Sequence, residues 1–423
     1  MKKKLGAVSL SGLMIGPVLG SGIVVLPSLA YEALHEYAIY AWILVMLLGA
    51  GFAYVFTRMS MMVSTNEGVS RLIGDALGER FRELSANYLT AAVCFGPVAV
   101  YQTAKGYVMN MLPDGTLPAM VIPFLLMALN VLILFSGVRM MGNVSLILSS
   151  VTACILVAGS IYSLSQNGIS ALPAELPPLS TLGSTLLILF WAIIGWEVIG
   201  NYVEDVLNPK RTLMRAMKVS VAAVVLVYMV VTYALQNSPL VKSGASSIRL
   251  NAIMTPMFGT VAPYFLGAVA LALCYCTILL VMGAVSRQMA ARAESGRLPA
   301  IFRQKPGYRA PMKSILFLSL IHSVFIVLIE TKLVSLTFVV GIANTFFIGN
   351  ALLGLFGAFK CMKGVWCKGL IVVLSACLLS LLLFSPAAGW VLFLAVTVGT
   401  VAIVPRTAGK GSMAEEGQPM ENT

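Results

Sequence analysis

The sequence predicts an all-α membrane protein with twelve transmembrane helices. Hydrophobic residues make up 59% of its 423 residues and charged residues only 10%, whereas a soluble domain carries about 25% charged residues. Uncharged runs long enough to cross a bilayer as helices recur along the whole chain. The loops between them are too short for a separate catalytic domain, so residues 1–423 are predicted to form one transmembrane domain.

The runs without Asp, Glu, Lys or Arg define the predicted helices in order. They are 5–31, 37–57, 84–104, 115–138, 140–174, 176–196, 219–241, 250–286, 314–329, 333–359 and 369–405. Run 140–174 becomes polar after Tyr162, which predicts one helix and an outer loop, and run 250–286 opens with a polar stretch before its helix. The last run has Ser385 and Pro386 near its middle and is long enough for two helices. Eleven runs therefore predict twelve helices. A helix is the spanning structure that satisfies the backbone hydrogen bonds within its own segment.

The basic residues predict the orientation. Sorting the loops places 24 of the 28 Lys and Arg residues on one side of the membrane, and the other side keeps Lys105, Lys242, Arg249 and Lys332. Because cytoplasmic loops carry the excess of Lys and Arg, both termini are predicted to be cytoplasmic. Lys105 is expected to extend outward from the end of the third helix. The net charge of +12 thus reflects membrane topology, and nucleic acid is not a predicted partner.

The first run contains a predicted interruption. Its glycines recur every four residues, at Gly12, Gly16 and Gly20. Such a stripe allows another helix to approach closely. Gly20, Ser21 and Gly22 then weaken the helix at mid-membrane depth, with Pro17 just before them. An interrupted helix leaves amide groups that must line a cavity or face a ligand, and amides at the start of the second half-helix suit a carboxylate.

The sixth run predicts a second, weaker interruption at Gly195, directly before the intramembrane acid Glu197. An acid in a membrane span indicates a functional site, although Glu197 could equally be a structural acid bonded to neighbouring groups. Trp191 either packs as a bulky core residue or closes over a substrate. Helices one and six occupy corresponding positions in two five-helix halves, and the odd number of helices per half makes the two repeats inverted. The predicted segments are 5–165 and 176–359 for the repeats, 366–405 for helices eleven and twelve, and 406–423 for a cytoplasmic tail.

Four segments resemble the amino acid–polyamine–organocation superfamily. They are Gly20 to Ile23, Phe190 to Glu197, Glu204 to Arg211 and Ser286 to Pro299. They occur in family order, and the resemblance extends over helices one to ten. The length and the residues of helices one and six are most similar to the short bacterial amino acid efflux branch. The resemblance implies the leucine-transporter fold, with five plus five inverted helices and two appended helices, in a bacterial cytoplasmic (inner) membrane.

The resemblance also implies where a substrate binds. In such transporters the substrate carboxylate meets the break in helix one and its amino group meets carbonyls at the break in helix six. The residues implied here are Gly20, Ser21, Gly22 and Ile23 for the first break, Trp191, Ala192, Ile194 and Gly195 for the second, and Pro97, Tyr101, Gly341 and Asn344 for the side-chain pocket. Because no acid other than Glu197 lies near this site, the expected substrates are small neutral, mainly hydrophobic amino acids, with export favoured over import.

The coupling ion is less defined by the sequence. Uptake members of the superfamily carry a Lys on helix five, and the equivalent position here falls near Thr152, which puts that mechanism in doubt. A sodium site between helices one and eight would draw on Thr277, while proton antiport through Glu197 or plain exchange stays open. Glu204 and Asp205 are candidate gating residues that could pair with cytoplasmic bases.

Enzymatic functions are disfavoured. The sequence holds two widely separated histidines, and it contains neither His-Glu-x-x-His nor Gly-x-Ser-x-Gly. The seven cysteines lie in the predicted spans or on the reducing side, so a disulfide framework is not expected. Cys274 and Cys276 are two apart on a helix and point to different faces, which argues against a shared metal, and no cofactor is expected. The remaining alternative from another class is a sensor or partner-dependent subunit that does not itself transport.

Overall fold

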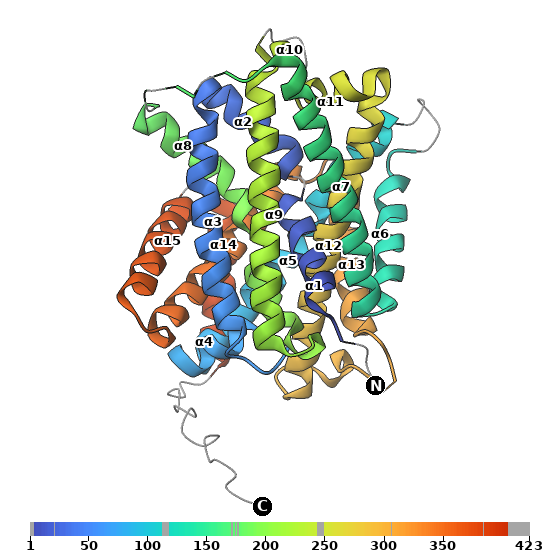
Figure 1. Cartoon of the computed structure of the whole chain (residues 1–423). Coiled ribbons are helices and arrows are strands. Elements are labelled where there is room, and N and C mark those ends of the chain that lie inside the picture. Colours follow the sequence, from blue (N-terminus) through green and yellow to red (C-terminus); the bar gives the residue numbers. More distant parts are fainter. Residues whose placement is uncertain are drawn as a thin grey trace, which may run out of the picture.

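The structure is a computed structural model that describes residues 4–404 apart from 21, 112–117, 171, 174, 176, 243–248, 306 and 384. Within these residues the chain is helical, with one isolated parallel bridge between Leu5 and Val206. Most of the long helices run side by side in the same general direction, as Figure 1 shows.

The helices follow the order of the predicted runs. The first half contains α1 (Ala7–Leu19), α2 (Gly22–Leu34), α3 (Ala38–Ser60), α4 (Val69–Leu77), α5 (Glu79–Met111), α6 (Val121–Phe135) and α7 (Val138–Asn167). The second half contains α8 (Leu179–Leu189), α9 (Pro209–Asn237), α10 (Pro239–Lys242), α11 (Arg249–Phe258), α12 (Ala262–Glu294), α13 (Met312–Glu330), α14 (Leu336–Cys361), α15 (Val365–Leu383) and α16 (Ala387–Ile403). Short 3₁₀ helices are η1 (His35–Tyr37), η2 (Phe190–Ile193), η3 (Glu197–Asp205), η4 (Gly259–Val261) and η5 (Ala300–Phe302).

The protein is a polytopic membrane protein, as its composition predicts. By length and composition, eight helical stretches of the described chain can cross a membrane, and α1, α6 and α16 are shorter apolar helices. The predicted sixth helix is irregular, because α8 has eleven residues and is followed by two 3₁₀ helices. The polar stretch that opens run 250–286 is itself helical and forms α11.

Close packing of α1 against its neighbours confirms the role of the glycine stripe. A Cβ at Gly12 would lie 2.3 Å from the Cα of Leu146 on α7, and a Cβ at Gly16 would lie 2.5 Å from the Cβ of Cys276 on α12. Ser145 on α7 donates a hydrogen bond of 2.8 Å to the Gly12 carbonyl. Glycine therefore allows α1 to pack directly on two helices, since any side chain would force them apart.

Both ends of the described chain lie at the same end of the bundle, here called the inner end. The Leu5 amide donates to the Asp205 carbonyl at 2.7 Å, and Arg80 donates to the carbonyl of Val404 at 2.8 Å. Helix α4 lies at this end, whereas α10 lies at the opposite, outer end (Figure 1). The arrangement agrees with an even number of crossings, and the assignment of the inner end to the cytoplasm stays a prediction.

Lys105 pairs with an acid at the outer end. Its Nζ lies 2.6 Å from Oε1 of Glu330, the last residue of α13, and Gln102 donates to the same oxygen at 2.9 Å. The side chain therefore pairs with the end of the neighbouring helix, a contact that the prediction did not include. Sequence reasoning missed this because the partner carboxylate lies more than two hundred residues further along the chain.

Candidate functional site

The first predicted interruption is present. Helix α1 ends at Leu19, where the Gly20 amide still donates to the Gly16 carbonyl at 2.7 Å. Gly20 then adopts φ +44° and ψ −156°, a conformation that glycine tolerates and other residues rarely do. Helix α2 begins at Gly22, so its first amide groups have no carbonyl one turn earlier within the helix. Ser21 lies outside the described residues.

A tyrosine from α9 holds the end of α1. The hydroxyl of Tyr228 donates to the carbonyls of Val18 and Leu19, each at 3.2 Å. Its ring stacks on Trp42 of α3 with centroids 4.4 Å apart, and both side chains are fully buried. Carbonyls at a helix end inside a membrane need such partners. Tyr228 therefore stabilises the break, a role that nothing in its apolar sequence neighbourhood indicates.

The second predicted interruption is also present. After η2 the chain becomes extended at Ile194 (φ −69°, ψ 139°), and Gly195 takes φ +122° before η3 begins. Glu197 is 3% exposed, and its Oε2 accepts a hydrogen bond of 2.9 Å from the Gly195 amide. The acid thus contacts the break directly, a contact that is compatible with both the structural and the functional reading of Glu197. Carbonyls of the turn before Ile194 lose the amide partners that a continuous helix would supply.

The two breaks lie side by side. A Cβ at Gly22 would lie 3.7 Å from Cδ1 of Trp191, and one at Gly195 would lie 3.7 Å from Cγ2 of Val18. Amide groups at the start of α2 and carbonyls at the end of η2 therefore belong to one region, with opposite partial charges. Such a pair of helix ends can bind the carboxylate and amino groups of one small zwitterion.

The other residues expected at the first and second breaks vary in exposure. Ile23 and Ala192 are buried, while Trp191 and Ile194 are half-buried. A Cβ at Gly22 would lie 3.0 Å from the Tyr228 hydroxyl. Backbone at Gly22 is therefore approachable only because the residue lacks a side chain.

The residues predicted for the side-chain pocket lie on α5 and α14, two helices that pack against each other. Pro97 and Tyr101 are buried on α5, and the Tyr101 hydroxyl lies 3.9 Å from the sulfur of Met282 on α12. Asn344 on α14 is half-buried, and its Oδ1 is buried without a hydrogen-bond partner among the described residues. A Cβ at Gly341 would lie 2.5 Å from Cγ of Pro386, so Gly341 packs against the segment that precedes α16.

Of the two threonines considered for ion coupling, one lies at a break. A Cβ at Gly20 would lie 3.2 Å from Oγ1 of Thr277 on α12, and that hydroxyl donates to the Leu273 carbonyl at 2.9 Å. Thr152 is buried on α7. The described residues contain no group of three His, Cys, Asp or Glu side chains that could hold a metal ion.

Asp205, at the end of η3, pairs with a base at the inner end. Its Oδ2 lies 2.7 Å from Nε of Arg287 on α12, and the guanidinium also donates to the Gly283 carbonyl at 2.8 Å. The Arg287 guanidinium lies 5.0 Å from the ring centroid of Tyr202, within cation–π range. Glu204, the other gating candidate, accepts a hydrogen bond of 3.1 Å from the Asn66 amide.

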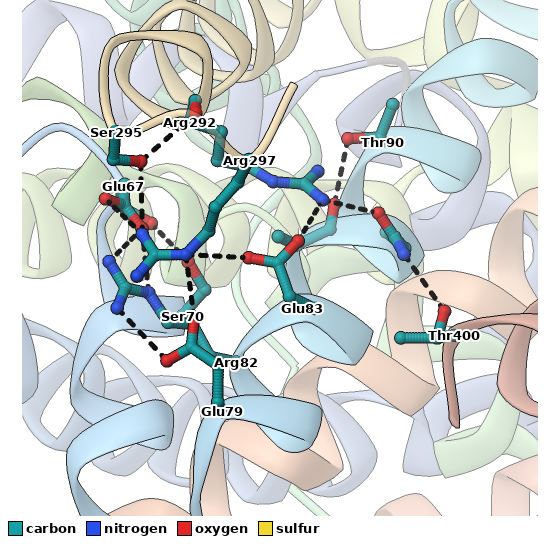
Figure 2. A network of polar contacts seen from close by, with 12 residues as sticks. Glu67, Ser70, Glu79, Arg82, Glu83, Thr90, Arg292, Ser295, Arg297 and Thr400 are labelled. Atoms are coloured by element: carbon teal, nitrogen blue, oxygen red, sulfur yellow. Dashed lines mark hydrogen bonds and ion pairs between the residues drawn. The ribbon is translucent and has the colours of Figure 1, made fainter. Parts of the chain in front are cut away.

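A larger ion network at the same end was not predicted. Arg82 lies 2.6 Å from Glu67, Arg292 lies 2.5 Å from Glu83, and Arg297 lies 2.7 Å from Glu79. Figure 2 shows Arg297 among the three glutamates, so the network joins the segment before α4, the start of α5 and the end of α12. Sequence reasoning counted these arginines as topology determinants, since their partners are distant in sequence.

Comparison with known proteins identifies the family of the chain. The family model described as "Amino acid permease" matches residues 5–408. The chain is 21% identical over 293 residues to the uncharacterized amino acid permease YecA of Bacillus subtilis (strain 168), covering 69% of each chain. It is 22% identical over 298 residues to the L-methionine/branched-chain amino acid exporter YjeH of Escherichia coli (strain K12), covering 70% of this chain and 71% of the relative.

A further relative is named for a different class of substrate. The chain is 22% identical over 338 residues to the cadaverine/lysine antiporter of Escherichia coli (strain K12), covering 77% of this chain and 75% of the relative. These relatives are membrane transporters and not enzymes. With a family model that matches almost its whole length, the chain belongs to the amino acid permease family, a family of amino acid and polyamine secondary transporters.

Proposed function

We propose that this protein is a secondary active transporter that exports small neutral, mainly hydrophobic amino acids by alternating access. The observation that carries the proposal is the adjacency of the two helix breaks. They supply amide donors and carbonyl acceptors to one buried region without a formal charge pair. A zwitterion needs both kinds of group, and its desolvation is offset when backbone dipoles replace its water.

The surroundings of the breaks support a neutral substrate. The side chains that approach Gly20, Gly22 and Gly195 most closely include those of Thr277, Tyr228, Leu26, Trp191 and Val18, and all five are uncharged. The carboxylate of Glu197 is engaged by the Gly195 amide. A cationic side chain, as in lysine or a diamine, would need an uncommitted acid here, because a buried unpaired charge is strongly unfavourable. The name of one relative, a methionine and branched-chain amino acid exporter, agrees with this substrate class.

The proposed architecture is twelve crossings in a bacterial inner membrane with both termini in the cytoplasm. The broken segment α1–α2 opens the first inverted repeat of five, and the broken segment from α8 to η3 opens the second. Helices α15 and α16 are appended to the repeats. Support comes from the matching positions of the two breaks, the shared inner location of both described chain ends and the excess of bases at that end.

We infer that ion pairs keep the inner end closed in this arrangement. Ion pairs join Asp205 to Arg287, and they join the loop before α4 to α5 and to Arg297 in the segment that follows α12. Alternating access requires the Asp205–Arg287 connection between η3 and α12 to separate when the substrate path opens inward. We assign a proton as the coupling ion for antiport, because Glu197 places a carboxylate at the second break. Sodium is disfavoured, because Thr277 alone among the nearby α12 residues 274, 276 and 277 offers a side-chain oxygen.

Flux through the purified full-length protein in liposomes tests the proposal. Vesicles loaded with labelled leucine, methionine, arginine or putrescine should release leucine and methionine only. Transport of arginine or putrescine without leucine would refute the substrate class and favour polyamine exchange. Absence of flux with every substrate would favour the sensor alternative. Gly183→Val is the matched control for a glycine-to-valine change at a break, such as Gly22→Val. A Cβ at Gly183 meets nothing within 4 Å, so this variant should still transport.

A further inference from the structure

Two adjoining cavities open at the inner end, away from the helix breaks. The larger, of about 620 Å³, is lined by residues of the α6–α7 turn and the start of α7, by Asp205 and by the loop 307–309. The smaller, of about 390 Å³, is lined by residues 4–6 and 9, Arg139, Asn143 and Leu207. Because both cavities share Arg139 and Asn143, we treat them as one inner basic pocket. Its polar lining is formed by Lys4, Ser9, Ser136, Arg139, Asn143, Asp205, Tyr308 and Arg309.

The positive charges that line this pocket outnumber the negative ones and have no ion-pair partners among the described residues. Three cationic side chains, Lys4, Arg139 and Arg309, line it against one carboxylate, Asp205. That carboxylate is already paired with Arg287 at 2.7 Å. The three cations are exposed, and none of them has an ion-pair partner among the described residues. The arginines of the ion network, Arg82, Arg292 and Arg297, are by contrast all paired with glutamates.

We propose that the inner basic pocket binds a phosphate group, supplied either by an anionic lipid headgroup or by a soluble phosphate. Guanidinium groups bind phosphate oxygens through paired N–H donors, and the pocket presents two of them, Arg139 and Arg309. The Asn143 amide and the Tyr308 hydroxyl add uncharged donors. Basic pockets beside membrane helices on the cytoplasmic side are typical sites for anionic headgroups.

The surface beside the pocket favours the lipid source. Helix α6 carries an exposed apolar stripe of Leu125, Leu129 and Leu132, spaced along one face. The stripe ends at Ser136, the first residue of the α6–α7 turn that lines the pocket. An acyl chain lying along this stripe would therefore bring its phosphate to the level of Arg139. A soluble phosphate would gain nothing from the stripe.

Occupancy of the pocket is expected to stabilise the closed inner end, an inference that rests on the proposed alternating access. One wall contains Leu5 and Asp205, and the Leu5 amide donates a hydrogen bond of 2.7 Å to the Asp205 carbonyl. The other wall is the α6–α7 turn and the loop 307–309. Inward opening moves the first wall away from the second, so a phosphate that contacts both walls binds the closed state better.

Binding is tested on the full-length protein in an uncharged detergent, from the midpoint of thermal unfolding. Dioctanoyl phosphatidylglycerol should raise the midpoint in a saturable way, and dioctanoyl phosphatidylcholine should not. The double variant Arg139→Gln with Arg309→Gln should raise the apparent Kd about 30-fold, because each cation near an anionic headgroup contributes about 1 kcal/mol of binding free energy. The matched control is Arg211→Gln with Arg215→Gln, two exposed arginines at the same end outside the pocket, and it should leave the Kd unchanged.

The outcomes separate the sources and the proposals. If inorganic phosphate raises the midpoint to the same extent and the pocket variant abolishes this, the site is supported with a soluble phosphate as its ligand. Equal stabilisation by both lipids, or equal weakening in the pocket and control variants, would overturn it. The measurement involves no flux, so its failure leaves the transport proposal intact, and failure of transport leaves the binding result interpretable.

Discussion

Replacement of Asp205 by Asn should open the inner end of the transporter. The Asp205 carboxylate is 14% exposed and lies 2.7 Å from Nε of Arg287, whose side chain is 4% exposed. Asn removes the negative charge and keeps the size of the side chain. Because the pair joins η3 to α12, we expect it to form only while the inner end is closed. The variant should therefore destabilise the closed state relative to the inward-open state.

The size of the effect follows from what Arg287 loses and keeps. Removing one partner of a buried ion pair costs about 3–5 kcal/mol, because the other charge stays buried. Here the guanidinium keeps its bond to the Gly283 carbonyl at 2.8 Å and its contact with Tyr202. We therefore expect about 2–3 kcal/mol, a shift of about 30- to 150-fold in the ratio of open to closed protein.

Alkylation of Cys276 by a water-soluble maleimide reports this shift. Cys276 is fully buried, and α1 covers it at Gly16, where an added Cβ would lie 2.8 Å from its sulfur. In a background that keeps only this cysteine, Asp205→Asn should raise the labelling rate by about the same factor as the population shift. Asp75→Asn is the control, since the Arg71–Asp75 pair is exposed and should contribute at most about 0.5 kcal/mol. Equal labelling rates in the two variants would refute the gating role of Asp205.

Three further changes test the breaks and the outer end. Tyr228→Phe keeps the ring but removes the donor to two buried carbonyls, so the free energy of unfolding should fall by about 1–3 kcal/mol. The control is Tyr264→Phe, at an exposed ring, which should change the free energy of unfolding by less than about 0.5 kcal/mol. Gly22→Val should abolish substrate binding in a scintillation proximity assay yet insert normally, because its Cβ would lie 3.0 Å from the Tyr228 hydroxyl; unchanged affinity would move the site elsewhere. Glu330→Gln leaves Lys105 without its carboxylate and should lower the unfolding midpoint in detergent by an amount equivalent to about 1.5–3 kcal/mol, whereas an unaltered midpoint would show that the pair contributes little.

Features that depend on local sequence were predictable. Glycine at Gly20 and Gly195 marks backbone conformations that other residues rarely adopt, and both positions have a positive φ. The stripe at Gly12 and Gly16 likewise indicates close helix contact, since small residues are what such contacts require. The helix order followed from uncharged runs, because each span satisfies its own backbone. These signals lie within about twenty residues of the feature that they predict.

Features that depend on partners distant in the chain were not predictable. Tyr228 contacts Val18 and Leu19 from more than two hundred residues away, and its sequence neighbourhood reads as an ordinary apolar helix. Arg82 and Arg292 were read as cytoplasmic charges, although both are almost fully buried in ion pairs. Hydropathy and charge counts report which side of a membrane a residue occupies, and they contain no information on its partner.

The two sets of inner-end contacts differ in kind, which indicates how this end can open. The loop before α4 is joined to η3 by two neutral amide hydrogen bonds and one bond to a carboxylate. Asn201 donates to the Asn66 carbonyl at 3.1 Å, the Glu204 amide donates to the Asn66 side chain at 2.9 Å, and the Asn66 amide donates to the Glu204 carboxylate at 3.1 Å. The same loop is joined to α5 by Glu67, which receives two hydrogen bonds from buried Arg82 at 2.9 and 2.6 Å. Charge-assisted hydrogen bonds are roughly twice as strong as neutral ones. The loop should therefore stay with α5 and α12 when η3 moves, so the separating surface runs along Asn66 and the Asp205–Arg287 pair and leaves the glutamate–arginine network of Figure 2 intact.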